Sequence, residues 1–384
     1  MVNSRFQLSD TFNRFFESEK SGGLVLIAAT IISLFLANSS MGPSYVNFWD
    51  HKVLGLTIAE WINDGLMAIF FLLIGLELER EIYTGELSNP KSASLPFFAA
   101  LGGMILPALI HYSFNYGTPT QDGAGIPMAT DIAFALGALA LLGNKIPPAL
   151  KVFVVAFAVI DDLGAIVVIG MFYSHEVSAY YLLAAMTLLI GLVVLNNRRI
   201  MSLYPYIIGG TLLWFLMLKS GVHPTIAGVM LAFAIPFTNK LREQASPSYK
   251  LEKMLHKPAA FLILPLFALA NTAITFEGNL SDYINTVNFA GISLGLIIGK
   301  PLGVIIFSFI GITLGFSKLP AGVKWSHLLG AGILGGIGFT MSIFITNLAF
   351  HDLQTTINAS KIAIMFASLT AGALGYIWLK YRAN

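Results

Sequence analysis

Asp161 and Asp162 lie next to each other in the middle of an apolar stretch that runs from Val152 to Tyr173. A helix needs about 20 apolar residues to cross a bilayer, so this stretch is long enough to span one. Each carboxyl group at the centre of such a span costs about 2.5–3.5 kcal/mol even on a lenient insertion scale. Side chains this costly at that depth usually contact something that crosses the membrane.

The aspartate pair has the chemistry of a site where a cation and protons compete. Adjacent helical residues point about 100° apart, yet a cation held between helices can reach both carboxylates. Hard cations such as Na⁺ prefer carboxylate, hydroxyl and carbonyl oxygens, while burial and mutual repulsion favour protonation of the same oxygens. The alternative is that the two carboxylates are structural and pair with a lysine or with backbone groups.

A second polar pair, Thr130 and Asp131, follows a segment that contains Gly123, Gly125 and Pro127. Proline lacks a backbone N–H and glycine weakens a helix, so we expect the helix to be interrupted here. Such backbone at membrane depth is tolerated only where protein or water covers it. Asp131 could bind the cation or neutralise the N-terminal ends of the broken half-helices, and the electrostatic role is favoured.

Lys300 is the third candidate, near the middle of another apolar span. Gly291, Gly295, Gly299 and Gly303 recur there at every fourth position and give one smooth face, on which another helix can pack closely. The lysine lies too deep to reach the bilayer surface comfortably. We expect it to meet a carboxylate or the carbonyl end of a broken helix, either as a functional group or as a purely structural counter-ion.

The segment from Gly335 to Ser342 contains three glycines within four residues. Because each glycine costs about 1 kcal/mol relative to alanine in a helix, we predict a second interrupted span here. Two interrupted spans in the two halves of a chain are typical of transporters built from inverted repeats. Spans three to five and ten to twelve would then be the related units.

The composition predicts a membrane protein. Hydrophobic residues make up 56% of the chain and charged residues only 11%, against about 25% charged residues in a soluble domain. We therefore predict an all-α polytopic membrane protein with about twelve transmembrane helices that form a single transmembrane domain over residues 1–384. The net charge of +2 includes no basic tract for nucleic acid, and the absence of cysteine excludes disulfides and thiolate metal sites.

The predicted spans share a length of about 20 residues. The fourth and the eleventh contain the two interruptions, and the seventh and eighth are short. They lie near 12–37, 58–84, 94–115, 121–143, 148–173, 180–196, 204–219, 222–236, 249–274, 288–314, 325–350 and 358–382.

The charges between these spans give an orientation. Most lysines and arginines fall on one side, whereas the other side keeps Lys52, Lys219 and Lys361. By the positive-inside rule the basic side is cytoplasmic, and an even number of spans places both termini there. The longest loop on the opposite face is 41–57, where Tyr45–Trp49 and Val53–Thr57 could pair as a hairpin or form an ordinary loop.

With these features the sequence resembles the NhaA-type Na⁺/H⁺ antiporters of bacterial inner membranes over nearly its whole length. Seven motifs carry the resemblance, in the same order as in that family. They are Trp61–Asp64, Phe70–Glu77, Ala129–Gly137, Ile160–Ile166, Lys219–His223, Gly299–Gly303 and Gly335–Ser342.

The resemblance implies a role for each candidate. Asp161 and Asp162 would be the ion-binding aspartates, with Asp162 the central ligand of Na⁺ and Thr130 a further oxygen. Asp131 and Lys300 would balance charge where the interrupted spans cross. A cytoplasmic pH-sensing cluster would consist of Glu77, Arg80, Glu81, His223, Glu252 and His256. One departure is visible, because Lys253 stands where a histidine is expected, and it bears on the pH threshold rather than on transport.

We therefore predict a transporter, not an enzyme, that exports Na⁺ or Li⁺ in exchange for protons and needs no cofactor. Two carboxylates for each cation predict two protons for each cation, so the exchange would be electrogenic, and the resemblance implies activation by pH. By the same resemblance the protein would be a multi-pass protein of the bacterial inner membrane, and the loop at 41–57 would be the contact of a homodimer.

Two other functions are weighed against this prediction. A Na⁺-coupled solute symporter would need a pocket for an organic substrate, which the sequence does not locate. An intramembrane aspartyl protease would use Asp131 with Asp161 or Asp162, two carboxyl groups that share a proton. However, the chain contains no Gly-Asp dipeptide, and a protease would leave Lys300 unexplained.

Overall fold

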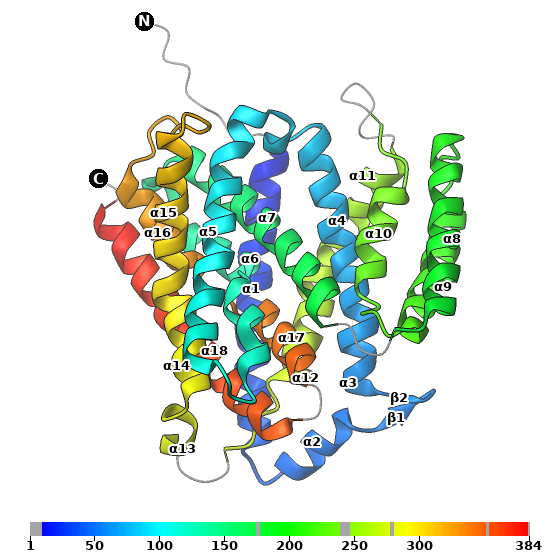
Figure 1. Cartoon of the computed structure of the whole chain (residues 1–384), viewed down its shortest axis with the longest axis horizontal. Helices are drawn as coiled ribbons and strands as arrows, with labels where there is room; N and C mark the ends of the chain where they lie inside the picture. Colours follow the sequence, from blue (N-terminus) through cyan, green and yellow to red (C-terminus); the bar gives the residue numbers. More distant parts are fainter. Residues whose placement is uncertain (1–9, 174–176, 239–245, 277–279, 351–352, 383–384) are drawn as a thin grey trace, which may run out of the picture. The chain divides into compact units, whose positions relative to one another are not determined.

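The computed structural model describes residues 10–173, 177–238, 246–276, 280–350 and 353–382 (Figure 1). In these ranges nearly all secondary structure is helical, and the described strands form one two-stranded sheet. This confirms the predicted all-α polytopic fold. The two termini, which the charges predict to be cytoplasmic, lie outside the described residues.

Eight helical segments in the described ranges are long and apolar enough to cross a membrane, and two bent helix pairs raise the number to ten. The two remaining predicted spans are α9 (Tyr204–Ser220) and α10 (Ile226–Ala234), of 17 and 9 residues. At 1.5 Å per residue both are shorter than the hydrocarbon core of about 30 Å. The expected twelve spans therefore include two that do not reach the length of a full crossing.

Packing divides the chain into two compact units. The first unit consists of Met1–Ile27, Asn89–Ala165 and Phe276–Asn384, and the second of Ala28–Ser88 and Ile166–Thr275. The predicted spans three to five and ten to twelve, which the sequence indicates to be related, thus lie almost entirely in the first unit.

Helices from two separate parts of the chain build the first unit, and α7 continues from it into the second. The elements are α5 (Pro90–Asn115), η3 (Gln121–Met128), α6 (Ile132–Leu141), η4 (Gly143–Lys145), α7 (Pro148–Phe172), α13 (Leu280–Ile284), α14 (Val287–Leu294), η7 (Gly295–Gly299), α15 (Lys300–Thr313), α16 (Trp325–Gly335), α17 (Phe339–Ala349) and α18 (Gln354–Arg382).

Both predicted interruptions are confirmed. The 3₁₀-helix η3 ends at Met128, the backbone of Ala129 and Asp131 is extended, and α6 begins at Ile132. In the second interrupted span, α16 and α17 are bent by 46° relative to each other across residues 336–338. Glycine and proline at these breaks leave backbone groups without helical partners, so other groups must satisfy them.

The glycine face on α15 packs against α5, and Figure 1 shows the two helices side by side. A Cβ atom on Gly303 would collide with the carbonyl group of Gly102, and one on Gly299 would come within 3.0 Å of the Cα atom of Pro107. The π-helical turn η7 directly precedes Lys300 and Pro301. Because proline cannot donate a backbone hydrogen bond, it disturbs the preceding turn and favours such an irregularity.

The second unit contains the remaining elements, and α1 enters it from the first. They are α1 (Asp10–Ala37), α2 (Gly42–Trp49), β1 (Lys52–Val53), β2 (Leu56–Thr57), α3 (Ile58–Glu60), η1 (Trp61–Leu66), α4 (Met67–Tyr83), η2 (Glu86–Ser88), α8 (Ala179–Asn197), α9, α10, α11 (Pro247–Pro258), η6 (Ala259–Ile263) and α12 (Leu264–Asn271).

The loop at 41–57 differs in part from the predicted hairpin. The run Tyr45–Trp49 belongs to α2, which has a proline in its first turn, a position that favours a helix start. The hairpin instead pairs Lys52 with Thr57 and Val53 with Leu56. Its turn, Leu54 and Gly55, has positive φ at both residues, the geometry of the tightest hairpin turns.

Candidate functional site

Lys300 and Asp161 form an ion pair inside the first unit. Neither side chain is exposed, and Nζ of Lys300 donates to Oδ2 of Asp161 at 2.6 Å. The same ammonium group donates to the carbonyl oxygen of Met128, the last residue of η3, and lies 5.8 Å from the ring centre of Phe157. Lys300 thus meets both of the partners that were expected, a carboxylate and the carbonyl end of a broken helix.

The other acidic candidates lie at the same place. Asp162 follows Asp161 on α7, is 1% exposed and interacts electrostatically with Lys300. Thr130 is fully buried beside Asp161. The structure therefore brings together a pair of carboxylates, a lysine and a hydroxyl group, all within one unit and away from solvent.

The two interrupted spans are joined directly by hydrogen bonds at their breaks. The hydroxyl group of Thr130 donates to the carbonyl oxygen of Gly335 at 2.9 Å, and the backbone N–H of Asp131 donates to the carbonyl oxygen of Ile337 at 2.6 Å. In the opposite direction, the hydroxyl group of Ser342 donates to the carbonyl oxygen of Ile126 at 2.7 Å. Each broken span thus satisfies carbonyl groups that the other leaves without helical partners.

Asp131 caps the N-terminal ends of α6 and α17, the second half-helix of each interrupted span. Its Oδ1 accepts a hydrogen bond from the backbone N–H of Phe134 in α6, at 3.1 Å. Its Oδ2 accepts from the backbone N–H of Thr340 in α17 at 3.0 Å and from the hydroxyl group of the same threonine at 2.5 Å. One carboxylate therefore faces the positive ends of two helix dipoles, which is the arrangement that stabilises a negative charge.

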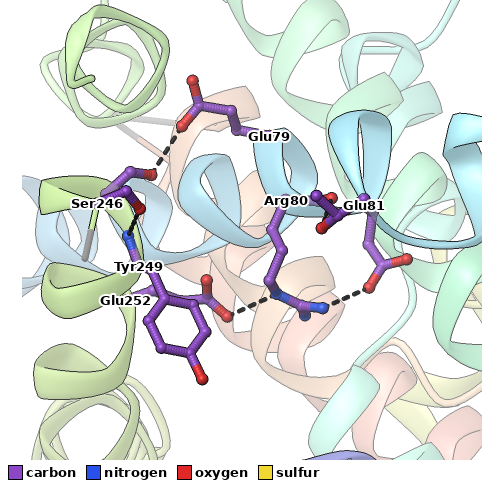
Figure 2. Close-up of polar contacts among 8 residues, drawn as sticks. Glu79, Arg80, Glu81, Ser246, Tyr249 and Glu252 are labelled. Atoms are coloured by element: carbon purple, nitrogen blue, oxygen red, sulfur yellow. Dashed lines mark hydrogen bonds and ion pairs between the residues drawn. The ribbon is translucent and has the colours of Figure 1, made fainter. Parts of the chain in front are cut away.

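The acidic and basic residues near the end of α4 meet α11 within the second unit (Figure 2). Nε of Arg80 lies 2.9 Å from Oε1 of Glu252, and its Nη1 lies 2.9 Å from Oε1 of Glu81. Glu77 belongs to the same end of α4 and is 7% exposed. His256 lies one turn after Glu252 and close enough to Arg80 for their charges to interact.

His223 lies apart from this cluster in the second unit. It follows the C-terminal end of α9, whereas Tyr206 at the start of α9 packs in one hydrophobic cluster with Leu251 of α11. From Tyr206 to the last residue of α9 the helix rises roughly 20 Å. Of the residues predicted to sense pH, the structure therefore brings together those on α4 and α11 but not His223.

No group of three or more His, Cys, Asp or Glu side chains in the described ranges could hold a metal ion. A cation in the first unit would instead meet two carboxylates together with hydroxyl and carbonyl oxygens. Oxygens of these kinds are the ligands that a hard cation prefers.

Comparison with known proteins shows the family of this chain. A family model described as Na⁺/H⁺ antiporter 1 matches residues 13–379. The chain belongs to the Na⁺/H⁺ antiporter 1 family. It is 59% identical to the Na(+)/H(+) antiporter NhaA of Dechloromonas aromatica over 383 residues, which cover 99% of this chain and 98% of the relative.

Two further relatives are similar over nearly the same length. The Na(+)/H(+) antiporter NhaA 1 of Flavobacterium johnsoniae is 57% identical, with 98% of each chain covered. The Na(+)/H(+) antiporter NhaA of Vibrio parahaemolyticus is 46% identical, with 97% of this chain and 98% of the relative covered. The resemblance noted from the sequence motifs is therefore confirmed.

Three polar contacts of this antiporter were not expected from its sequence. Thr340 and Ser342 donate to Asp131 and to Ile126, although only the glycines of their motif were given a role. Two hydroxyl residues beside a glycine-rich break were the signal that could have found them. In the second unit, Ser248 donates to Oε2 of Glu79 at 2.7 Å, and both side chains are buried.

Proposed function

We propose that Asp161 and Asp162 are the groups at which this Na⁺/H⁺ antiporter exchanges its cation for protons. The observation that carries the proposal is the burial of both carboxylates beside Lys300, where two interrupted spans cross. Charged groups inside a membrane are so costly that they are retained mainly where ions pass. Na⁺ and Li⁺ are both hard cations and would use the same oxygens.

Asp162 would be the central ligand of the cation, because Lys300 already holds Oδ2 of Asp161 at 2.6 Å. Thr130 lies beside Asp161 and would add an oxygen as the cation enters. For the cation to reach Asp161 as well, the lysine has to loosen its bond to that carboxylate. Lys300 would then be the group that returns to Asp161 when the cation leaves.

Transport would alternate between two exposures of this one site. When the site faces the cytoplasm, the two carboxyl groups release protons and bind one Na⁺ or Li⁺. When it faces the opposite side, two protons displace the cation. Each cycle would move one positive charge out and two in, so the exchange would be electrogenic and driven by an inside-negative potential. If Lys300 carries one of the two protons, the charge balance is the same.

Asp131 would be an electrostatic group rather than a cation ligand. Both of its oxygens already accept hydrogen bonds from backbone N–H groups at the ends of α6 and α17. A fixed negative charge at two helix N-termini would keep the crossing together while the neighbouring carboxylates change partners.

The charged cluster of Glu77, Arg80, Glu81, Glu252 and His256 would make transport depend on pH. Nε of Arg80 on α4 lies 2.9 Å from Oε1 of Glu252 on α11, so a change of charge at either residue would alter how the two helices pack. His223 would have to act separately, from the other end of α9.

The whole chain would act as a single transporter domain in the inner membrane of a bacterium, with both termini in the cytoplasm and no cofactor. It would form a homodimer through the hairpin of β1 and β2. The hairpin is suited to such a contact because Leu54 at its turn is 90% exposed and Val53 is 43% exposed. Trp61 fixes the hairpin to its own chain by donating to the carbonyl oxygen of Val53 at 2.8 Å.

Everted membrane vesicles from cells without their own antiporters would test the assignment of the site. The vesicles are energised to an acid interior, NaCl or LiCl is added at several pH values, and a dye reports the pH gradient. Wild type and Asp50→Asn, a control that removes an exposed loop carboxylate, should dissipate the gradient, whereas Asp162→Asn should not. Exchange that persists in Asp162→Asn would move the site elsewhere.

Reconstitution into liposomes separates the alternatives. Liposomes that contain only the purified protein, Na⁺ and a proton gradient support an antiporter but not a solute symporter. A response to neither Na⁺ nor Li⁺ at any pH, with the protein present in the membrane, would reopen the symporter reading. A transport rate that does not change with membrane potential would contradict the two-proton stoichiometry.

A further inference from the structure

Thr340 donates two hydrogen bonds to one carboxylate oxygen of Asp131. Asp131 and Thr340 are each 2% exposed, and the threonine gives Oδ2 two hydrogen bonds, one from its backbone N–H and one from its hydroxyl group. We propose that Thr340 positions Asp131 as a helix-capping group and thereby excludes it from the coordination of the transported cation. This inference rests on the proposed function.

The exclusion of Asp131 from cation coordination matters because Asp131 lies close to the proposed cation site. It directly follows Thr130, and Thr130 lies beside Asp161. A third carboxylate oxygen at this place would be a good ligand for a hard cation. A site that transports must bind its ion tightly enough to load it and weakly enough to release it. One more anionic ligand would favour loading and slow the release.

The hydroxyl group is the part of this contact that a substitution can remove. The two donors of Thr340 both bond to Oδ2 of Asp131, whereas the backbone N–H of Phe134 bonds to Oδ1. In Thr340→Val the backbone N–H remains, the side chain keeps its shape, and Oδ2 loses the hydroxyl donor. The bonds from Thr130 to Gly335 and from Asp131 to Ile337 still join the two spans.

Ser342 provides a matched control on the same helix. Its hydroxyl group is also fully buried and also crosses to the other interrupted span, but it donates to the carbonyl oxygen of Ile126 and not to a carboxylate. Ser342→Ala therefore removes a bond at the crossing without releasing an anionic oxygen. A purely structural role of these hydroxyl groups would give both variants the same kinetic effect.

The test is the dependence of exchange on Na⁺ concentration in proteoliposomes at fixed pH and potential. Thr340→Val should lower the apparent KM for Na⁺ and lower the maximal rate, because the cation binds better and leaves more slowly. The expected decrease in KM is roughly two- to tenfold, the factor that corresponds to the net free energy of one hydrogen bond. Thr340→Ser, which keeps the hydroxyl group, should restore the wild-type KM. Ser342→Ala should reduce at most the maximal rate.

A double variant shows whether the effect acts through Asp131. In Asp131→Asn/Thr340→Val the decrease in KM should disappear relative to Asp131→Asn alone. An unchanged or raised KM in Thr340→Val, or a decrease that persists in the double variant, would overturn the proposal. If Thr340→Val does not accumulate, Thr340→Ala replaces it, with the same expected and contradicting results. As a second measurement, thermal unfolding in detergent should show that Na⁺ stabilises the variant half-maximally at a lower concentration than wild type. Failure of the proposed function would appear separately, as exchange in Asp162→Asn.

Discussion

The ammonium nitrogen of Lys300 lies 2.6 Å from Oδ2 of Asp161, and neither side chain is exposed to solvent. A buried charge without a partner is strongly unfavourable, so each of these two groups depends on the other. The pair also ties α7 to α15, and through the carbonyl oxygen of Met128 it ties both helices to the end of η3. Charge balance and packing at the crossing therefore rest on the same lysine.

Loss of one member of the Lys300–Asp161 pair should destabilise the protein strongly. Removing one partner of a buried ion pair typically costs about 3–5 kcal/mol, because the other charge is left uncompensated. We expect a lower free energy of unfolding for Lys300→Met and for Asp161→Leu. Thermal unfolding of the purified protein in detergent measures this.

The double variant Lys300→Met/Asp161→Leu serves as the control for that cost. It removes both charges at once, so it should recover most of the stability that either single variant loses. Additive losses in the double variant would show that the two side chains do not depend on each other.

The glycine face of α15 should tolerate no added methyl group at Gly303. A Cβ atom there would overlap the carbonyl group of Gly102 on α5, so the two helices would have to move apart. We expect Gly303→Ala to destabilise the protein by about 1–3 kcal/mol, as overpacking does. Gly191→Ala in α8 is the matched control, because a Cβ atom there meets no atom within 4 Å and alanine favours a helix. Equal thermal unfolding of the two variants would contradict the close contact.

The breaks at Pro127 and at the glycines before Phe339 could be predicted because proline and glycine act on the backbone that contains them. The partners of Lys300 could be predicted as kinds of group, since a buried ammonium group needs a negative charge or carbonyl oxygens. The partner residue itself, Asp161, lies 139 positions away in the chain, and such a pairing depends on how helices pack.

The contact of Thr340 with Asp131 was missed for a physical reason. A threonine or serine in a helix can bond to a carbonyl group of its own preceding turn, so its presence in an apolar span needs no distant partner. The aromatic and β-branched residues of Tyr45–Trp49 favour a strand, so the sequence left a hairpin and an ordinary loop open. Pro43 in the first turn of α2 favours a helix instead, and this signal is present in the sequence.

The buried bond between Ser248 and Glu79 should contribute to the pH dependence of transport. Ser248→Ala leaves a buried carboxyl group without its 2.7 Å donor, at the point where α11 begins beside α4. We expect a shifted pH profile of Na⁺-dependent exchange. Ser246→Ala is the control, because Ser246 caps the same helix by accepting from the N–H of Tyr249. That cap contributes about 1 kcal/mol to stability but does not contact Glu79. Equal pH profiles for the two variants would assign the bond a structural role only.

Glu252→Gln should move the pH profile of exchange toward higher pH. The amide has the shape of the protonated acid and cannot form the ion pair with Arg80. At every pH, position 252 of the variant therefore lacks the negative charge, as Glu252 of the wild type does only at low pH. If loss of protons from this cluster activates transport, a cluster with one carboxylate fewer needs a more alkaline medium to reach the same state. Rates measured in everted vesicles across a pH series give the midpoint of activation.

Two controls give this prediction its specificity. Lys250→Gln changes an exposed charge on α11 that belongs to no ion pair described above, so its midpoint should stay at the wild-type pH. Glu81→Gln removes the second acidic partner of Arg80, at 2.9 Å, and should shift the midpoint in the same direction as Glu252→Gln. A midpoint unchanged in both glutamate variants would place pH sensing outside this cluster, while a shift in Lys250→Gln of equal size would show only a response to net charge.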